Sequence, residues 1–306
     1  MNANASLGSP VYYPGTPSAV FVGDYPYSYA SNCQPNVTTS TTPCGFLYSV
    51  SSSGTVTASI QLDYNNGIID SPILDANAGM VYAFVGQDNN GSPSAGTTCG
   101  IAGGPVVPCA GVYQFPVTFT AGATGTEAQV GVGSQFMMSG AFDNAYFTTG
   151  TGNLYIVGNT GPANNTLYQI PITSGVISTS TNAGPMVANN YTNGYYAAGL
   201  QVTEYLNGGA DYIFTSVLAF GNATGCTGQS VLNGCAMGLN VTAGTISPSS
   251  NVTGALPEAG GTSGIVVDYA PGAAGNIYFS TLLNTSCTLP ATVTAGCAIQ
   301  TNQAIP

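Results

Sequence analysis

The 306-residue chain contains no lysine, arginine, histidine or tryptophan, although it carries 11 aspartate and glutamate residues. Because every charged side chain is negative, no salt bridge between side chains can form. The lack of histidine excludes an imidazole base, a Ser-His-Asp or Cys-His site, and a histidine metal ligand. The lack of lysine excludes a Schiff base and a phosphate-binding P-loop lysine. The composition therefore predicts a protein that is not an enzyme.

The missing cations also limit the partners that the protein can bind. Nucleic acids are bound through Lys and Arg side chains that neutralise phosphates, so a nucleic-acid partner is excluded. Anionic membrane surfaces are excluded on the same ground. No apolar stretch approaches the ~20 residues of a membrane-spanning helix. We therefore expect an unknown protein or a glycan as partner, and no membrane insertion.

What the chain does contain is typical of an all-β protein with a sizeable core. Hydrophobic residues make up 44 % of the sequence, which is enough to bury a core and argues against disorder. The 42 glycines and 19 tyrosines favour many short strands joined by tight turns.

Eight cysteines fall into four neighbouring pairs, separated by 11, 10, 9 and 10 positions. Zinc is the alternative interpretation, but the chain has no CxxC motif and no histidine. We expect four disulfides, each closing a small loop and contributing roughly 2–3 kcal/mol. Disulfides indicate an oxidising compartment, and so an extracellular or cell-surface location. The expected pairs are Cys33–Cys44, Cys99–Cys109, Cys226–Cys235 and Cys287–Cys297.

Strand-like runs recur in groups of four along the chain. Anchors at the end of the first strand of each group lie at intervals of 62, 68, 61 and 64 residues, and they are Tyr13, Asp75, Asp143, Glu204 and Asp268. A fixed period of this length with four strands per unit predicts a single β-propeller domain spanning 1–306. The five expected blades cover 8–62, 70–132, 138–182, 199–250 and 262–306.

Some strands of this scheme are less distinct than others. In the third repeat 145–147 could lengthen the first strand, and the loop at 159–165 is the shortest of its kind and has no cysteine. In the fourth repeat we expect 244–246 to be the outer strand. The fifth repeat lacks an outer strand, so we expect 1–7 to supply it and to close the ring. The alternative is a fragment of a six- to eight-bladed parent with an open seam.

The run at 45–56, GFLYSVSSSGTV, resembles the repeat of secreted bacterial β-propellers of the YVTN and PQQ-like type. The runs at 20–23 and 81–86 resemble the preceding strand of such repeats. The resemblance touches all five repeats through degenerate strand patterns, and it implies a propeller fold and an exported location. Because the chain lacks the tryptophan and the cationic groups of quinone-binding propellers, we expect no cofactor of that kind.

The acids form two groups along the sequence. Those at the end of each first strand precede turns, where Asp accepts backbone N–H groups, so we expect Asp75, Asp143, Glu204 and Asp268 to cap turns. A second group falls in loops that share one face of a propeller. Its members are Asp24, Asp63, Asp70, Asp88 and Glu258, with Tyr25, Tyr64, Tyr191, Tyr195 and Tyr196 nearby in the sequence.

For this second group we expect a solvated acidic rim. The functional alternatives are Ca²⁺ held by carboxylate oxygens, or a sugar stacked on tyrosine. A carbohydrate-active, glycosidase-like propeller is a further alternative, because it would need only carboxylates at its axis. Our main expectation is a non-catalytic extracellular binding or structural module. Once the thiols are bridged, no side chain should titrate between about pH 6 and 9, so stability should be flat there.

Overall fold

The computed structural model describes residues 5–26, 44–63, 67–88, 108–133, 137–161, 164–188, 201–218, 221–222, 226, 233–250, 252–268, 275–287 and 293–302. Within these ranges the regular elements are all strands, apart from one short helix, α1 (Asn144–Thr149). The all-β prediction is therefore confirmed. No helix within these ranges has the length and apolar character needed to cross a membrane.

The chain divides into two compact units, which we describe separately. Unit 1 comprises Met1–Ser139, Gly158–Pro162 and Ile170–Thr181, and unit 2 comprises Gly140–Val157, Ala163–Gln169 and Asn182–Pro306. Two long strands, β11 (Gly152–Gly161) and β12 (Asn164–Thr173), contribute residues to both units.

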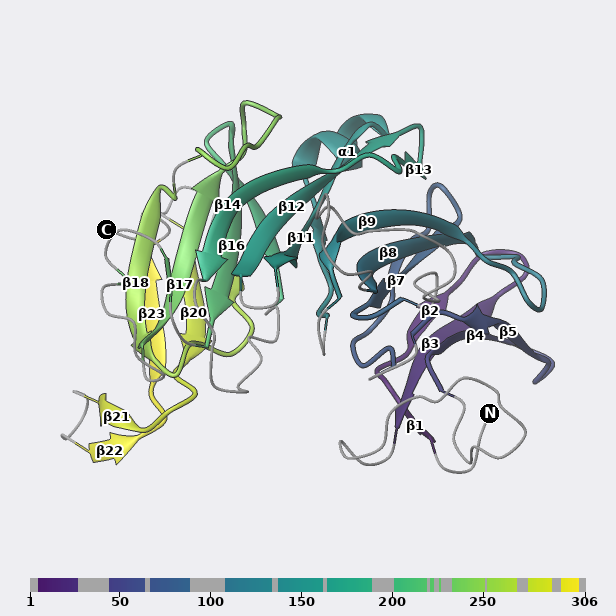
Figure 1. Cartoon of the computed structure of the whole chain (residues 1–306), viewed down its shortest axis with the longest axis horizontal. Helices are drawn as coiled ribbons and strands as arrows, with labels where there is room; N and C mark the ends of the chain where they lie inside the picture. The colour runs from purple at the N-terminus through teal and green to yellow at the C-terminus, as the bar shows by residue number, and fades with distance from the viewer. Residues whose placement is uncertain are drawn as a thin grey trace. The chain divides into compact units, whose positions relative to one another are not determined.

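Unit 1 contains two antiparallel meanders in which each strand pairs with the next (Figure 1). The first consists of β2 (Val11–Tyr13), β3 (Ala19–Pro26), β4 (Phe46–Ser51) and β5 (Val56–Gln61). The second consists of β6 (Ile73–Asp75), β7 (Met80–Val85), β8 (Cys109–Pro116) and β9 (Thr126–Val132). Both follow the strand order expected from the sequence, because alternating apolar residues and glycine turns mark each strand there.

The described part of the amino-terminal segment pairs within unit 1. Strand β1 (Ala5–Leu7) pairs antiparallel with β3, with Ala5 opposite Pro26 and Leu7 opposite Asp24. Strand β2 pairs with the other half of β3, so both short strands lie along β3. That 1–7 supplies the outer strand of the last repeat stays a prediction.

The third repeat differs from its prediction in two places. Residues 145–147 do not lengthen a strand but belong to α1, because Asp143 caps the helix start and Gly150 ends it with φ +70°. The repeat begins with β10 (Ala141–Phe142), continues through β11 and β12, and ends with β14 (Asn182–Ala188). Its outer strand thus lies beyond the predicted boundary at 182.

The fourth and fifth repeats lie in unit 2. The fourth meander consists of β15 (Thr203–Asn207), β16 (Ala210–Val217), β17 (Asn233–Asn240) and β18 (Gly254–Ala259). Its outer strand is β18 and not 244–246, because Gly244 turns the chain with φ +89° directly after β17. The fifth repeat has a three-stranded sheet of β19 (Val266–Asp268), β20 (Asn276–Ser280) and β23 (Ala298–Asn302).

Successive sheets within each unit share hydrophobic cores. In unit 1, Phe21 and Leu47 of the first meander pack in one cluster with Val81 and Phe115 of the second. In unit 2, one cluster joins the third and fourth repeats, and another joins Phe214 of the fourth to Phe279 of the fifth. Burial of this apolar surface is the main stabilising contribution, at about 25 cal/mol per Å².

A glutamine clamp joins two repeats in unit 1. Gln114 on β8 lies directly opposite Tyr82 on β7. Its Nε2 donates to Tyr82 Oη at 2.8 Å and to the Gly175 carbonyl at 2.6 Å, while its Oε1 accepts from the Ile177 N–H at 3.2 Å. The turn at Gly175 leads into β13 (Val176–Ile177). One buried side chain therefore hydrogen-bonds both a backbone carbonyl and a backbone N–H of the next repeat.

The same clamp recurs in unit 2. Gln169 Nε2 donates to Tyr155 Oη at 3.0 Å and to the Gly244 carbonyl, and its Oε1 accepts from the Ile246 N–H at 3.3 Å. The two glutamines occupy matching places in the sequence echo YQFPV at 113–117 and YQIPI at 168–172. Strand formation alone does not require a glutamine at this position. The repeated glutamine therefore indicates that the buried amide has the same role in both repeats.

Two disulfides lie wholly within the described residues. Cys226 and Cys235 have Cα atoms 5.8 Å apart, and Cys287 and Cys297 have Cα atoms 5.6 Å apart. Cys44 and Cys109 are also disulfide-bonded, while their predicted partners Cys33 and Cys99 lie outside the described ranges.

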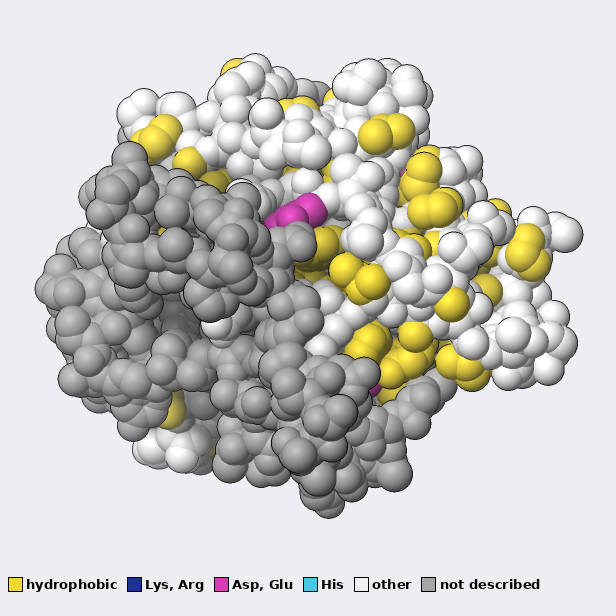
Figure 2. All heavy atoms as spheres, turned by 45° about the vertical axis from the view of Figure 1, so that its right-hand side comes forward, with side chains coloured by type: hydrophobic (Ala, Val, Ile, Leu, Met, Phe, Trp, Pro, Cys, Tyr) yellow, Lys and Arg dark blue, Asp and Glu magenta, His cyan; other side chains and the backbone are white. Residues whose placement is uncertain are grey.

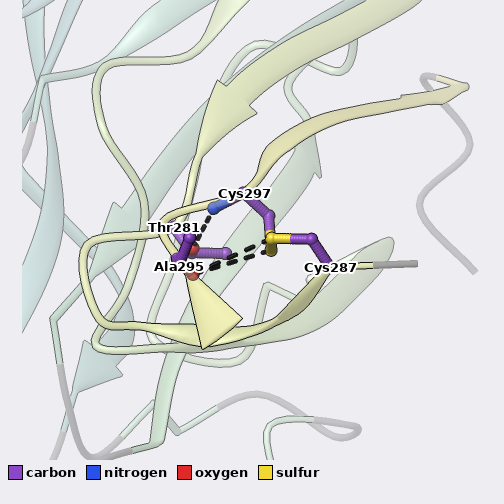
Figure 3. The surroundings of a disulfide bond; sticks show 4 residues. All are labelled: Thr281, Cys287, Ala295 and Cys297. Carbon is purple, nitrogen blue, oxygen red and sulfur yellow. Dashed lines mark hydrogen bonds between the residues drawn. A yellow bond between two sulfur atoms is a disulfide. The ribbon is translucent and has the colours of Figure 1, made fainter. Parts of the chain in front are cut away.

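The Cys287–Cys297 bridge closes a small hairpin of β21 (Thr285–Cys287) and β22 (Val293–Ala295) (Figure 3). The Cys297 N–H donates to Thr281 Oγ1 at 2.9 Å, and the Thr281 N–H donates to the Cys297 carbonyl at 2.9 Å. The disulfide thus ties the loop end of β21 to the residue that precedes β23, and hydrogen bonds fix that residue to Thr281.

Candidate functional site

The carboxylates are the only charged side chains that could do chemistry here, and three of them are buried in unit 1. Asp24 and Asp63 are fully buried and Asp88 is 2 % exposed. The expected solvated rim is therefore wrong for these three residues. Isolated buried carboxylates are costly, so each must find hydrogen-bond donors or a proton.

Asp24 lies near the end of β3 and binds the start of β4. Its Oδ1 accepts from the N–H groups of Gly45 and Phe46, both at 2.7 Å, and its Oδ2 accepts from Tyr48 Oη at 3.1 Å. Burial raises the pKa of Asp24 to about 6, although these three donors oppose the shift. Burial and the neighbouring Asp24 raise the pKa of Tyr48 well above its usual range, so its hydroxyl remains a donor.

Asp63 joins two loops of unit 1 through its carboxylate. Its Oδ1 accepts from the Gly67 N–H at 3.0 Å, and its Oδ2 accepts from the N–H groups of Gly86 and Gln87 at 3.1 and 3.0 Å. The backbone of Asp63 also forms a β-bridge with that of Asp88, whose Oδ1 accepts from the Cys109 N–H at 2.9 Å. Backbone N–H groups thus perform the role that cationic side chains take in other proteins.

Two glycines allow this close approach. Gly45 has φ +86° and Gly67 has φ +73°, both in the left-handed region. A Cβ atom at Gly45 would collide with the Asp63 carbonyl, and one at Gly67 would lie 2.5 Å from the Asp24 carbonyl. The glycines therefore bring backbone donors within reach of the carboxylates.

The other acids and tyrosines that the sequence placed in loops do not all lie there, because Glu258 and Tyr25 belong to strands. Asp70 is half-buried and accepts from the N–H groups of Ser71 and Ser139 at 2.8 and 2.7 Å. Glu258 lies on β18 opposite Gly234, and burial raises its pKa to about 6. Of the nearby tyrosines, Tyr25 is half-buried on β3. Tyr64, Tyr191, Tyr195 and Tyr196 lie outside the described residues.

Among the acids expected to cap turns, three act as local acceptors. Asp75 Oδ1 accepts from the N–H groups of Asn77 and Ala78, both at 3.0 Å. Asp143 caps α1 and not a turn, accepting from the Tyr146 N–H at 2.9 Å. Asp268 accepts from Tyr278 Oη at 3.4 Å. Glu204 departs from the prediction, because β15 continues past it to Asn207.

Glu204 instead belongs to a group of three acids in unit 2. It lies on β15 opposite Ile213, while Asp211 near the start of β16 lies opposite Leu206, so the two acids are diagonal neighbours on one face of the hairpin. Asp211 Oδ2 also accepts from the Asn144 N–H at 3.0 Å, and Asp143 Oδ2 accepts from Asn153 Nδ2 at 2.7 Å. Burial first, and then Asp211 and Asp143, raise the pKa of Glu204 to about 8.

This finding changes the expected pH behaviour. A carboxyl group with a pKa of about 8 titrates inside the window from pH 6 to 9 that the sequence predicted to be silent. The sequence could not predict this raised pKa, because it depends on the strand register that makes Asp211 a neighbour of Glu204. Within the described part of the chain, no group of three or more acids or cysteines is placed to hold a metal ion.

The visible surface of the described residues carries little charge. Figure 2 shows one face of the molecule on which uncharged polar and apolar side chains predominate, with only small acidic areas. Independently of this view, five of the 11 acids of the chain are buried, and they are Asp24, Asp63, Asp88, Asp143 and Asp211.

No family model and no curated protein matches the chain. Among solved structures, it resembles a protein of unknown function from Dyadobacter fermentans, with 12 % identity and a TM-score of 0.41 over 99 % of this chain and 80 % of that one. It also resembles a putative gluconolactonase, with 13 % identity and a TM-score of 0.33 over 100 % of this chain and 91 % of that one. At such TM-scores these likenesses fix neither a blade number nor an activity.

Proposed function

We propose that the protein is a non-catalytic, extracellular binding or structural module built as a five-bladed β-propeller. The blade number rests on five consecutive meanders of similar length, the last with three strands in its main sheet. Packing of successive sheets within each unit is the arrangement that a propeller repeats around its axis. The partner would be a protein or a glycan that needs no positive charge on this chain.

One observation carries the non-catalytic role. In unit 1 the two fully buried carboxylates, Asp24 and Asp63, use both of their oxygens in structural hydrogen bonds. A carboxylate held in this way cannot approach a substrate without breaking those hydrogen bonds.

The exported location is supported by the disulfides. Two complete bridges and two further bridged cysteines are present in the described ranges, and such bonds persist in oxidising compartments. Alkylation of the intact protein followed by mass spectrometry should find no free thiol among the eight cysteines. Reactive thiols in freshly purified protein would contradict the exported role.

A specific observation favours one second candidate, a carbohydrate-active propeller. Glu204 and Asp211 share one face of the β15–β16 hairpin, which sets a carboxyl group of raised pKa beside a second carboxylate, as a general acid beside a base would be. Against this, Asp211 is nine-tenths buried and already binds the Asn144 N–H.

Turnover measurements on a panel of glycosides and lactones separate the two candidates. For the non-catalytic module we expect the wild type to show no more turnover than the Glu204→Gln and Asp211→Asn variants. Turnover by the wild type that both variants lose would establish the enzyme instead. A glycan array read with and without Ca²⁺ then tests the binding role, including its Ca²⁺-dependent form.

A further inference from the structure

Two buried carboxylate oxygens in unit 2 lack any N–H or O–H donor. They are Glu204 Oε1 and Asp211 Oδ1. Asp211 is 8 % exposed and Glu204 is half-buried, so water contributes little to Asp211. The β15–β16 register sets Glu204 opposite Ile213 and Asp211 opposite Leu206, so the two carboxyl groups are diagonal neighbours on one face of the hairpin. Ionised carboxylates only accept hydrogen bonds and repel each other, so two such neighbours with buried, donorless oxygens favour the state in which one of them carries a proton.

No side chain of this protein could neutralise the pair in another way, because the chain has no lysine, arginine or histidine. We propose that one proton shared by Glu204 and Asp211 fastens the β15–β16 hairpin to the start of α1, and that its loss in mildly alkaline solution loosens this corner. The protein would then carry a base-sensitive switch within unit 2.

The pair is connected to α1 by a direct contact. Asp211 Oδ2 accepts from the N–H of Asn144, the first helical residue, at 3.0 Å. When both carboxyl groups are ionised, their repulsion should push Asp211 away from Glu204 and disturb this hydrogen bond. The helix packs on the same unit through Phe142 and Tyr146, whose ring centroids lie 4.7 Å apart.

The ionisable groups around the pair supply no positive charge. Asp143 on the β10–α1 connection adds negative charge near Glu204, and Asn153 on β11 donates to Asp143. Burial, and then Asp143 and Asp211, raise the pKa of Tyr155 on β11 far above its usual range, so it stays neutral. Asp268 on β19, which also packs on β15, accepts from Tyr278.

The titration of Glu204 gives the sign of the effect. Its pKa in the folded protein is about 8, compared with an ordinary value of 4.5. The folded state therefore binds a proton that the unfolded state has released, and stability falls as pH rises from about 4.5 to about 8. The folding equilibrium constant should fall by up to about tenfold per pH unit, and by less where solvent screens the half-buried Glu204.

Urea unfolding of the full chain between pH 6.5 and 9.5 tests the switch. The wild type should lose about three- to tenfold in its folding constant per pH unit up to pH 8, then level off. The Glu204→Gln variant supplies a permanent N–H donor and should remove this dependence. Hydrogen exchange of the Asn144 amide at pH 9 should be faster in the wild type than in the variant. The matched control, Glu258→Gln, should keep the wild-type dependence, because Glu258 is already ionised at pH 7.

Equal pH dependence in the wild type and Glu204→Gln would overturn the proposal. So would stabilisation at pH 8.5 by Ca²⁺ that only the wild type shows, since a metal ion and not a proton would then hold the pair. Should Glu204→Gln fail to fold, ¹³C NMR of the wild-type carboxyl groups decides. A Glu204 midpoint above pH 7 supports the shared proton, and a midpoint below pH 7 excludes it.

Discussion

The two units bury carboxylates in different ways. In unit 1, the buried carboxylates of Asp24, Asp63 and Asp88 accept hydrogen bonds from backbone N–H groups. In unit 2, Glu204 lies within β15, whose backbone pairs with β16 from Thr203 to Asn207. Its Oε1 is buried without a donor, and so is Oδ1 of Asp211 on the same face of the hairpin. In a chain without cations, a buried acid is held as an anion where backbone donors reach it, and otherwise it needs a proton.

The largest effect that would sharpen this comparison is expected for Asp63→Ala. It removes the acceptor of three N–H groups, those of Gly67, Gly86 and Gln87. With these donors left buried, the free energy of unfolding should drop by about 3–5 kcal/mol in urea titrations. Asp75→Ala is the matched control, because Asp75 caps an exposed turn and should cost about 1 kcal/mol. Equal losses in both variants would show that burial adds nothing.

The second-largest effect is expected for Asp24, a buried acid that accepts backbone N–H groups and has a raised pKa. Burial raises the pKa of Asp24 to about 6 from 3.8, so stability should decrease by about 2–3 kcal/mol as pH rises from 4 to 6. Asp24→Asn keeps a carbonyl acceptor for Gly45 and Phe46 and should remove most of this decrease. Thermal melts at constant ionic strength measure it. A decrease that persists in full would place the titration elsewhere.

The glutamine clamps allow a comparison of the units at an uncharged site. Gln114→Leu and Gln169→Leu each remove the donor to a turn carbonyl and the acceptor of a turn N–H. We expect each to lose about 2 kcal/mol of unfolding free energy, because buried backbone groups are left unpaired. Gln300→Leu is the control, since Gln300 lies opposite Tyr278 in the same way but is exposed. A loss in only one unit would mean that the clamps are not equivalent.

The smallest effect is expected at Glu258. Its side chain is half-buried and burial alone raises its pKa to about 6. Because solvent screens the group, Glu258→Gln should change the unfolding free energy at pH 7.5 by about 0.5 kcal/mol or less. A change above about 1 kcal/mol in urea titrations would reveal a contact that Glu258 makes only when ionised.

The sequence predicted strands well where their patterns are local. The meanders of the first two repeats follow from alternating apolar residues and turn glycines: the run at 81–86 nearly coincides with β7, and the run at 20–23 lies within β3. In the later repeats the outer strands were less well predicted. The fourth was placed too early, at 244–246 in place of β18, and the third repeat was ended at 182, where β14 begins. Helix α1 was missed since its signal is only a cap at Asp143 and a glycine at 150.

The acids show where sequence reasoning stops. The rule that charged residues stay in solvent unless a cation pairs with them led to the solvated-rim interpretation for Asp24, Asp63 and Asp88. The three-dimensional structure shows that loop N–H groups replace the cation, and these depend on glycines far away in the sequence. The pairing of Glu204 with Asp211 depends in the same way on which strand residues lie side by side. The clamps had a visible signal in the repeated YQ-P pattern, whose glutamine had no assigned role.

The bridge between Cys287 and Cys297 joins the loop end of β21 to the residue that directly precedes β23, a strand that pairs with β20. The N–H and the carbonyl of Cys297 both hydrogen-bond to Thr281, so the start of β23 is held by its backbone as well. A force applied to the β21–β22 hairpin is therefore carried to the sheet through the sulfur atoms as well as through the chain. Reduction of this bond should weaken the mechanical coupling between hairpin and sheet while β20 and β23 stay paired.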